Sequence, residues 1–453
     1  MTQLLVRDKN FYKTILRVAI PVILQAMLTI AVNMTDTFML GFYGEIQISA
    51  SSLSGEFINI FQILCFGIGG GAGVLTAQYW GAGDISSLKK VVNIMLWITL
   101  SVAMVFTIVT ALFPAQIIAI YSPDAQIIEK GILYLKMSAA SFPLMGLSLT
   151  LTIVLRTVRQ VRVPLMATMT IFLANVFGNW VFIYGNLGAP ELQIQGAALS
   201  TLICRVIEVG IIGSYFLFVD QRIGYRIHDF FRKVARSQFA LYLKYSVPVI
   251  VSDFFLAFGN SAMAMVMGRI GPSFVAANAI IANVVRFSTV FNQGLSNSSS
   301  IITGNTLGEG DTERAYRQGV TFLVLSVGMG IIASVIVLLI APVVANFFTI
   351  TDETQAIIRQ LTYAVSFMVL FQTVEGLMTK GVLRGGGDTR FLMVADVLFM
   401  WIASIPLGYL AGIVFQLPAF WVYVALKIDW MLKSIWCIFR LRSRKWIRRV
   451  QAS

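Results

Sequence analysis

The sequence predicts an all-α membrane protein that crosses the bilayer about twelve times, in two homologous halves of six spans each. Three observations carry this prediction: a shortage of charge, an alternation of apolar windows with basic loops, and an internal repeat. Of the 453 residues, 57% are hydrophobic and only 12% are charged, and the mean hydropathy is +0.81. Soluble proteins carry about 25% charged residues. The composition therefore favours a polytopic membrane protein over a soluble globule with a large core.

Twelve apolar windows follow one another along the chain. The first six lie near residues 14–40, 47–79, 91–115, 131–155, 163–186 and 195–218. After a polar interval, the second six lie near residues 241–270, 274–306, 316–345, 356–383, 391–415 and 419–440. Each window is long enough to cross a hydrocarbon core of about 30 Å when some tilt is allowed. These windows are the predicted spans.

The loops between the windows differ in charge. Lysine and arginine gather after the even-numbered spans, in the interval 219–240 and in the tail, whereas the loops after odd-numbered spans are almost bare of them. This is the positive-inside pattern, so both termini are predicted to be cytoplasmic. The net charge of +13 lies mainly in these short segments. It therefore does not indicate a nucleic-acid-binding face.

An internal repeat divides the chain into halves. Residues 21–44 match residues 248–271, and both stretches open with Pro-Val-Ile. The loop 81–84 (Gly-Ala-Gly-Asp) recurs at 308–311 (Gly-Glu-Gly-Asp), and the shift is 227 residues in both cases. Because six is an even number, both halves enter from the same side and form a parallel repeat around an axis along the membrane normal. The predicted domains are an N-lobe at 1–218, a basic cytoplasmic linker at 219–240, a C-lobe at 241–441 and a basic cytoplasmic tail at 442–453.

Asp36 is the most informative charge, because a lone carboxylate inside an apolar span is costly. No basic residue lies three or four positions away from it, and Asn33 lies one helical turn before it. A carboxylate with amide and carbonyl oxygens around it suits Na⁺, or it can carry a proton. The alternative is a structural hydrogen bond that caps or kinks the first span. The repeat does not duplicate this acid: Asp36 falls on Met263, and the second half instead has Asp253.

The other intramembrane charges have simpler interpretations. Arg205 and Glu208 are three residues apart on one helical face, so we predict that they form an ion pair. Lys427 and Asp429 are two residues apart and do not face each other, so one of them is expected to reach another helix. For Asp253, the nearby Ser252 and Asn260 are candidate structural partners.

No catalytic constellation accompanies these charges. The only histidine, His228, lies in the predicted linker, and the three cysteines are far apart in apolar segments. Neither a metal-ligand spacing nor the phosphate-binding loop of an ATP-driven pump is present. The sequence therefore predicts a protein that is not an enzyme, and transport would have to use an ion gradient.

Several motifs together resemble a known family. They are the first-span pattern around Thr35-Asp36-Thr37, the loop 81–84, the segment 381–390 (Gly-Val-Leu-Arg-Gly-Gly-Gly-Asp-Thr-Arg), and an end containing Lys433 and the stretch 443–446 (Ser-Arg-Lys-Trp). The chain resembles a multidrug and toxic compound extrusion (MATE) transporter of a bacterial clade over nearly its whole length. The resemblance implies two pseudo-symmetric six-helix lobes around a central cavity, and export of organic cations or related amphiphiles by antiport with Na⁺ or H⁺.

The resemblance also implies site residues. An N-lobe cation site would use Asp36, Asn175, Asn179 and Thr201, with Asn33 nearby. Asn179 stands where the family often has an acid, which leaves Asp36 as the main ligand and the expected Na⁺ ligand. In the C-lobe, acids and amides are candidates to line the cavity. They are Asp253, Asn260, Glu375 and Asp396.

The leading hypothesis is an alternating-access antiporter with its coupling ion at Asp36. The alternative is a flippase for lipid-linked precursors or polysaccharides from the same wider superfamily. We expect a multi-pass monomer in a bacterial cytoplasmic membrane, in contact with membrane lipid and with small amphiphilic or cationic substrates. We expect no nucleic-acid partner, and no cofactor other than Na⁺ or H⁺ as coupling ion.

Overall fold

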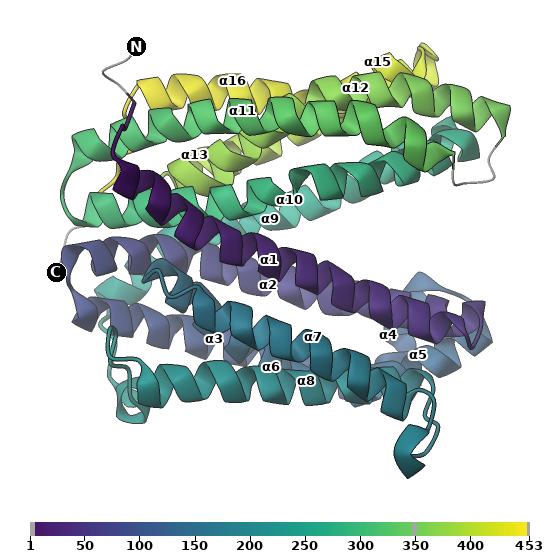
Figure 1. Ribbon diagram of the computed structural model, residues 1–453, viewed down its shortest axis with the longest axis horizontal. Coiled ribbons are helices and arrows are strands. Elements are labelled where there is room, and N and C mark those ends of the chain that lie inside the picture. The colour runs from purple at the N-terminus through teal and green to yellow at the C-terminus, as the bar shows by residue number, and fades with distance from the viewer. Residues whose placement is uncertain (1–4, 347–350, 451–453) are drawn as a thin grey trace. The chain divides into compact units, whose positions relative to one another are not determined.

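The computed structural model describes residues 5–346 and 351–450, and within these ranges the chain is helical without any strand (Figure 1). The helices of the first half are α1 (Lys9–Gly41), α2 (Glu45–Ala82), α3 (Ile85–Leu112), α4 (Pro114–Tyr121), α5 (Ala125–Ser138), α6 (Ser141–Thr157), α7 (Arg162–Phe182), η1 (Asn186–Gly188), α8 (Ile194–Ser214), η2 (Tyr215–Val219) and η3 (Ile227–Phe231). Those of the second half are α9 (Arg236–Ile270), α10 (Pro272–Gly308), α11 (Thr312–Ala345), α12 (Asp352–Leu377), η4 (Met378–Leu383), α13 (Thr389–Leu398), η5 (Phe399–Ser404), α14 (Ile405–Tyr409), η6 (Leu410–Val414), α15 (Ala419–Leu426) and α16 (Ile428–Arg442).

Ten of the described helical stretches are long and apolar enough to cross a membrane by themselves. The pair α5 and α6, which bends by 55° between its two parts, meets the same criterion only when the two helices are taken together, which would make an eleventh span. The last predicted span, 419–440, is divided into α15 and α16 at Lys427, whose φ of −117° and ψ of 16° are not helical. The all-α, multi-span fold is confirmed, and the twelve predicted spans are consistent with it. Helices suit this setting because a bilayer offers no water to hydrogen-bond an open backbone.

The described chain packs as two compact units. Unit 1 comprises residues 1–23, 77–83 and 247–453, of which residues 5–23, 77–83, 247–346 and 351–450 are described. Unit 2 comprises residues 24–76 and 84–246. The predicted lobes divide the chain by sequence repeat, whereas these units divide it by packing, and their boundaries differ. The start of α1 belongs to unit 1, and the start of α9 belongs to unit 2.

Buried contacts show how each unit holds a helix start from the other half of the sequence. In unit 1, Phe11, Ile15 and Ala19 share a buried cluster with Leu295 and Ile302 of α10. In unit 2, the Tyr242 hydroxyl donates to the backbone carbonyl of Ile68 in α2, at 3.1 Å. Tyr242 and Ile15 are equivalent positions under the shift of 227 residues. The first part of α1 therefore packs with most of the second half of the chain, and the first part of α9 packs with most of the first half.

The repeated Gly-x-Gly-Asp loops occur where α2 and α10 end. A Cβ on Gly81 would overlap the backbone of Asn305, and a Cβ on Gly308 would overlap the backbone of Gln78, so glycine permits this close crossing within unit 1. These two contacts are related by the same shift of 227 residues. Each loop then starts the next helix, because its aspartate accepts a backbone hydrogen bond as an N-cap: the Asp84 carboxylate from Ser87, and the Asp311 carboxylate from Arg314.

The predicted linker is an ordered part of unit 2. Asp229 in η3 is fully buried and forms ion pairs with Lys89 of α3 and Arg232, both at 2.8 Å. The side chain of Asn93 donates to the Asp229 carbonyl at 2.6 Å and accepts from the Tyr225 hydroxyl at 2.5 Å. The linker is therefore fixed to α3 by charge and hydrogen bonds.

Candidate functional site

The Asp36 carboxylate of α1 lies beside the side-chain amides of Asn175 and Asn179 in α7. The Asn179 Nδ2 donates to the Asp36 Oδ1 at 2.5 Å, and the same nitrogen lies 3.3 Å from the Asn175 Oδ1 one turn earlier. Asn175 and Asn179 are almost completely buried, with exposed fractions of 1% and 0%. The structure thus brings together three of the five predicted N-lobe site residues.

Two oxygen atoms at or beside this cluster are buried without a partner. They are the Asn179 Oδ1 and the Thr201 Oγ1, for which no hydrogen bond occurs among the described residues. Thr201 follows Ser200, whose hydroxyl donates to the backbone carbonyl of Asn175 at 3.3 Å, so α8 contacts α7 at this level. A buried polar atom without a partner typically costs about 1–3 kcal/mol. Uncompensated oxygens beside a carboxylate are what a hard cation would use as ligands.

Asn33 does not join the cluster. It is exposed, and within the described part of the chain its side chain makes no hydrogen bond, although its backbone carbonyl accepts from the Thr37 hydroxyl. The predicted pair of Arg205 and Glu208 is confirmed, with an N–O distance of 2.7 Å on α8. Arg205 lies one helical turn after Thr201, and its charge is paired with Glu208.

The four C-lobe candidates separate into two groups. Asp253 of α9 pairs with Arg384 at 3.7 Å, and Asn260 is exposed. The suggestion that Ser252 holds Asp253 is wrong, because the Ser252 hydroxyl donates to Asp396 at 2.5 Å instead. Successive residues of a helix point in different directions, so neighbours in sequence need not be partners in space. Asp396 and the fourth candidate, Glu375, lie together.

Sequence reasoning named Lys433 only as part of the family resemblance and missed that it joins these two acids. The Lys433 Nζ of α16 lies 3.4 Å from Glu375, 3.3 Å from Asp396 and 3.1 Å from Asp429. The Asp429 carboxylate accepts a further hydrogen bond from the Ser404 hydroxyl at 2.8 Å. The spacing of Asp429 and Lys433, four residues apart on one helix, was the available signal. The nearer Lys427 does not pair with Asp429 and instead contacts the Met263 Sδ at 3.8 Å and the Trp430 ring.

The glycine-rich segment 381–390 holds the C-terminal tail. The buried carboxylate of Asp388 contacts Arg440 at 2.6 Å and Arg448 at 2.8 Å. A Cβ on Gly386 would overlap the ring of Trp446, which is fully buried. The family-like motif therefore has a packing function within unit 1.

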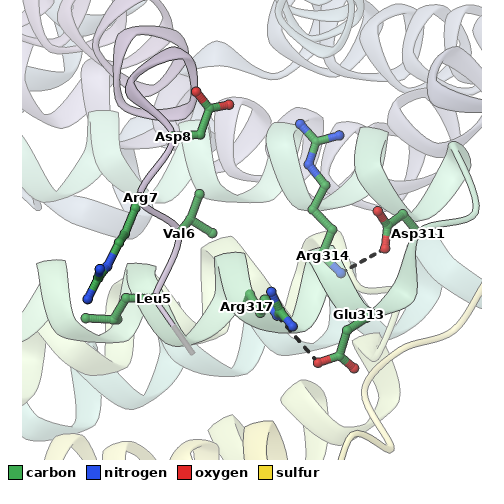
Figure 2. Close-up of a pocket in the computed structure, with 8 residues that line it drawn as sticks. All are labelled: Leu5, Val6, Arg7, Asp8, Asp311, Glu313, Arg314 and Arg317. Atoms are coloured by element: carbon green, nitrogen blue, oxygen red, sulfur yellow. Dashed lines mark hydrogen bonds and ion pairs between the residues drawn. The ribbon is translucent and has the colours of Figure 1, made fainter. Parts of the chain in front are cut away.

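A cleft of about 760 Å³ lies elsewhere in unit 1 and contains none of the predicted site residues. It is lined by Leu5, Val6, Arg7, Asp8, Asp311, Glu313, Arg314 and Arg317. Figure 2 shows both basic and acidic side chains around it, and Arg317 pairs with Glu313 at 3.7 Å. The lining carries three basic and three acidic side chains, so it offers no excess of either sign to a charged ligand.

Comparison with known proteins identifies the family. The family model described as MatE matches residues 21–181 and 248–410, which are the two copies of the repeat, each beginning at its Pro-Val-Ile. The chain belongs to the MATE family. The family consists of transporters, so this protein is a multi-pass membrane transporter of small molecules and not an enzyme.

Individual relatives are distant but span nearly the whole chain. A probable multidrug resistance protein NorM of Thermotoga maritima is 24% identical over 96% of this chain and 93% of its own length. An uncharacterized transporter, YisQ of Bacillus subtilis, is 22% identical over 98% of this chain and 97% of its own length.

Solved structures agree on the fold. A crystal structure of MATE in the bent conformation matches with a TM-score of 0.87 and 18% identity over 96% of both chains. A transporter of the MOP superfamily from Pyrococcus furiosus matches with a TM-score of 0.84 and 19% identity, also over 96% of both chains. These MATE-type folds support the twelve-helix architecture in two six-helix halves.

Proposed function

We propose that this protein is a secondary active exporter of small amphiphilic or cationic molecules that exchanges its substrate for Na⁺ or H⁺. The coupling ion binds at Asp36. Relatives named as multidrug resistance proteins support a multidrug substrate class. The positive-inside pattern supports a bacterial cytoplasmic membrane protein with both termini in the cytoplasm, and we propose that it acts as a monomer surrounded by lipid.

The observation that carries the proposal is the composition of the Asp36 cluster. Asp36 has amide partners, and no ion pair between it and a basic side chain occurs among the described residues. The unpartnered oxygens of Asn179 and Thr201 add neutral ligands, which together with the carboxylate suit Na⁺. The same carboxylate can instead take a proton and become neutral.

Ion binding at Asp36 would act on three helices at once. The cluster joins α1 to α7, and α7 contacts α8 through Ser200. A bound ion stabilises whichever arrangement of these helices gives it more ligands, and this difference in affinity shifts the transport equilibrium. Alternating access then follows from exchanging the ion for the substrate at different faces of the membrane.

The flippase alternative is less well supported. A lipid-linked pyrophosphate would need free basic side chains in the membrane. Two intramembrane basic residues, Arg205 and Lys433, and Arg384 at the end of the tenth span are instead paired with carboxylates.

The Asp36→Asn variant tests the assignment, because it keeps the shape of the side chain and removes its charge. In proteoliposomes, we expect this variant to lose efflux of a fluorescent cation driven by Na⁺ or H⁺ gradients, while its thermal stability in detergent stays close to that of the wild type. The two gradients, imposed separately, identify the ion.

Glu45→Gln is the matched control. Glu45 is an exposed carboxylate at the first turn of α2, so its loss should leave efflux unchanged. Efflux by Asp36→Asn at the wild-type rate would refute the coupling role.

A further inference from the structure

The linker between the two halves separates its charges. Residues 220–235 of the linker join the span of α8 and η2 to the span of α9, so they lie where both spans leave the bilayer. The only carboxylates in this stretch are Asp220 and Asp229, and both are buried, with exposed fractions of 1% and 0%. The basic side chains of Arg232 and Lys233 are exposed. The outer surface of the linker therefore carries positive charge without negative charge.

The exposed basic groups are only partly neutralised. Arg232 pairs with Asp229 through its Nε at 2.8 Å, and its side chain is still 44% exposed. Asp229 is also occupied by Lys89 at 2.8 Å. Lys233, and Arg236 at the start of α9, make no ion pair with a carboxylate in the described part of the chain. These cationic groups are available to an anionic ligand outside the fold.

Large apolar side chains occur in the same stretch of the chain. Ile227, Phe231 and Phe239 have exposed fractions of 58%, 75% and 42%. Ile227 and Phe231 belong to η3, outside the two spans, so the acyl chains that cover a span do not explain their exposure. Exposed apolar groups together with basic side chains are typical of segments that lie in the interface of a membrane.

The fold holds this surface in place. The Lys89 Nζ of α3 donates to the Gly224 carbonyl at 2.7 Å. The ring of Phe230 packs edge-on against Trp97 of α3, with 6.2 Å between the ring centroids, and Phe231 packs edge-on against Phe230 at 5.3 Å. The exposure of Phe231 is therefore fixed by the packing of its neighbour.

We propose that the linker is an interfacial anchor that binds the headgroups of anionic lipids. We define the linker surface as six residues: Ile227, Phe231, Phe239, Arg232, Lys233 and Arg236. Its basic groups contact lipid phosphates, and its apolar groups enter the boundary between headgroups and acyl chains. Both parts contribute, because binding at this boundary grows with apolar area and with attraction to anionic lipid. Each lysine or arginine near an anionic surface strengthens the attraction about fivefold.

A lipid surface fits the linker surface better than a soluble macromolecule does. The bilayer already lies beside it, because the chain leaves the membrane at Val219 and enters it again at Arg236. A nucleic acid would match the positive charge, but its phosphates offer nothing to Ile227 and Phe231. The same surface of a second copy would bring like charges together, which repel each other.

Lipid binding at the linker would act on several helix ends of unit 2. The Arg222 Nη1 donates to the Val158 carbonyl at the end of α6, at 3.1 Å, and the Arg226 Nη1 donates to the Leu217 carbonyl in η2, at 2.8 Å. Lys89 adds the start of α3. An anionic lipid surface would thus hold these ends at one depth. An effect on the transport rate rests on the proposed antiport function, whereas lipid binding itself does not.

A fluorescent reporter on the full-length protein tests the proposal. The native cysteines Cys65, Cys204 and Cys437 are buried, so a cysteine introduced at an exposed position can be labelled selectively. The Phe231→Cys variant, labelled with an environment-sensitive dye, is placed in nanodiscs of phosphatidylcholine alone or of phosphatidylcholine mixed with phosphatidylglycerol. In the anionic discs we expect a blue-shifted emission and strong quenching by lipids brominated near the headgroup. Both effects should be much smaller in the neutral discs.

Variants of the basic residues test the electrostatic part. Lys233→Gln combined with Arg236→Gln should remove most of the difference between the two lipid compositions, since two contributions of about fivefold each are lost. High salt should have the same effect, because it screens charges that contact water. Gln126→Cys is the matched control site: it is exposed in the same unit, and Asp124 and Glu129 lie near it in sequence. Its dye should not respond to anionic lipid.

Three results would overturn the proposal. They are equal emission in both lipid compositions, a full response in the double variant or at high salt, and a blue shift in detergent that grows with protein concentration. The last result would assign the surface to a second copy of the chain. If labelled Phe231→Cys is unstable, a dye on Ile227→Cys gives the same measurement. None of these measurements uses an ion gradient, so normal efflux by Asp36→Asn would refute the proposed coupling and leave the lipid result unchanged.

Discussion

The Oγ1 of Thr201 is buried, and no hydrogen bond among the described residues offsets the cost of its burial. This oxygen differs from the hydroxyl of Thr168, which donates to the Pro164 carbonyl at 2.9 Å. An uncompensated hydroxyl lowers stability, and natural proteins retain such atoms where a ligand uses them. Thr201 is therefore a residue at which stability and ion binding should respond in opposite directions.

The Thr201→Val variant separates these two effects. It keeps the shape of the side chain and removes the uncompensated oxygen, so thermal stability in ion-free buffer should stay level or rise by up to about 1 kcal/mol. If this oxygen is a ligand, the ion concentration for half-maximal efflux should increase by a factor of about ten to one hundred, since losing one interaction with a charge costs about 1.5–3 kcal/mol. Thr168→Val should show the reverse pattern, with lower stability and unchanged ion dependence. Equal ion dependence in Thr201→Val and the wild type would exclude the ligand role.

How far the sequence predicts the sites can be seen from single residues. Asp36 was identifiable as an acid without a helical partner, and the resemblance supplied Asn175 and Asn179. Local spacing predicted Arg205 with Glu208, because both lie on one helix. The ion pairs of Lys433 were not predicted, since two of its three carboxylates lie on α12 and α13 and only tertiary packing brings them together.

At the scale of elements, the linker shows how a polar segment is fixed. Burial by itself would raise the pKa of Asp229. The hydrogen bond from Lys89, the backbone hydrogen bond from Arg226 and the charges of Lys89 and Arg232 outweigh burial and hold that pKa below its ordinary value of 3.8. The contribution to stability is therefore complete above about pH 4 and is lost as the pH falls through the lowered pKa of the folded state.

The Asp229→Asn variant should remove this acid dependence. At neutral pH we expect a loss of about 2–3 kcal/mol, because the charged hydrogen bond from Lys89 and the ion pair with Arg232 disappear. As the acidity increases below about pH 4, the difference from the wild type should shrink. Thermal unfolding in detergent over this pH range measures both effects. Glu129→Gln, on an exposed side chain, should change stability by less than about 0.5 kcal/mol at any pH.

Helix number and type follow from composition and periodicity, but helix interruptions do not. The apolar windows predicted the spans, since each window fills the thickness of a bilayer. The 55° bend between α5 and α6 and the break at Lys427 lie inside windows that read as continuous. Hydropathy, which is averaged over a window, does not record such interruptions.

At the scale of the whole molecule, both halves of the repeat exchange their first helix start. Residues 5–23 pack in unit 1, with most of the second half, and the opening of α9 up to Ser246 packs in unit 2, with most of the first half. The passage from one unit to the other occurs beside the two Pro-Val-Ile stretches, at Ile23 in α1 and at Ser246 in α9. Proline within a helix removes a hydrogen bond and favours a kink, so both passages occur where the helix is weakest.

We therefore predict that neither half of the chain folds stably without the other. If residues 1–235 and 236–453 are produced as two chains, we expect each one alone to aggregate, because its first helix start has lost its buried partners. Produced together, they should co-purify through a tag on one chain and elute as one species at the position of the intact protein. A half that is monodisperse and thermally stable alone would show that the exchange contributes little to folding.

The exchange also sets an order on biosynthesis. The first 23 residues leave the ribosome long before α10, so the buried surface of Phe11 and Ile15 has no partner until two thirds of the chain has been made. The first span is therefore incompletely packed in the membrane until α10 has been made. Two six-span chains that exchanged only the first part of their first helices would make equivalent contacts, so the exchange corresponds to a domain swap within one polypeptide.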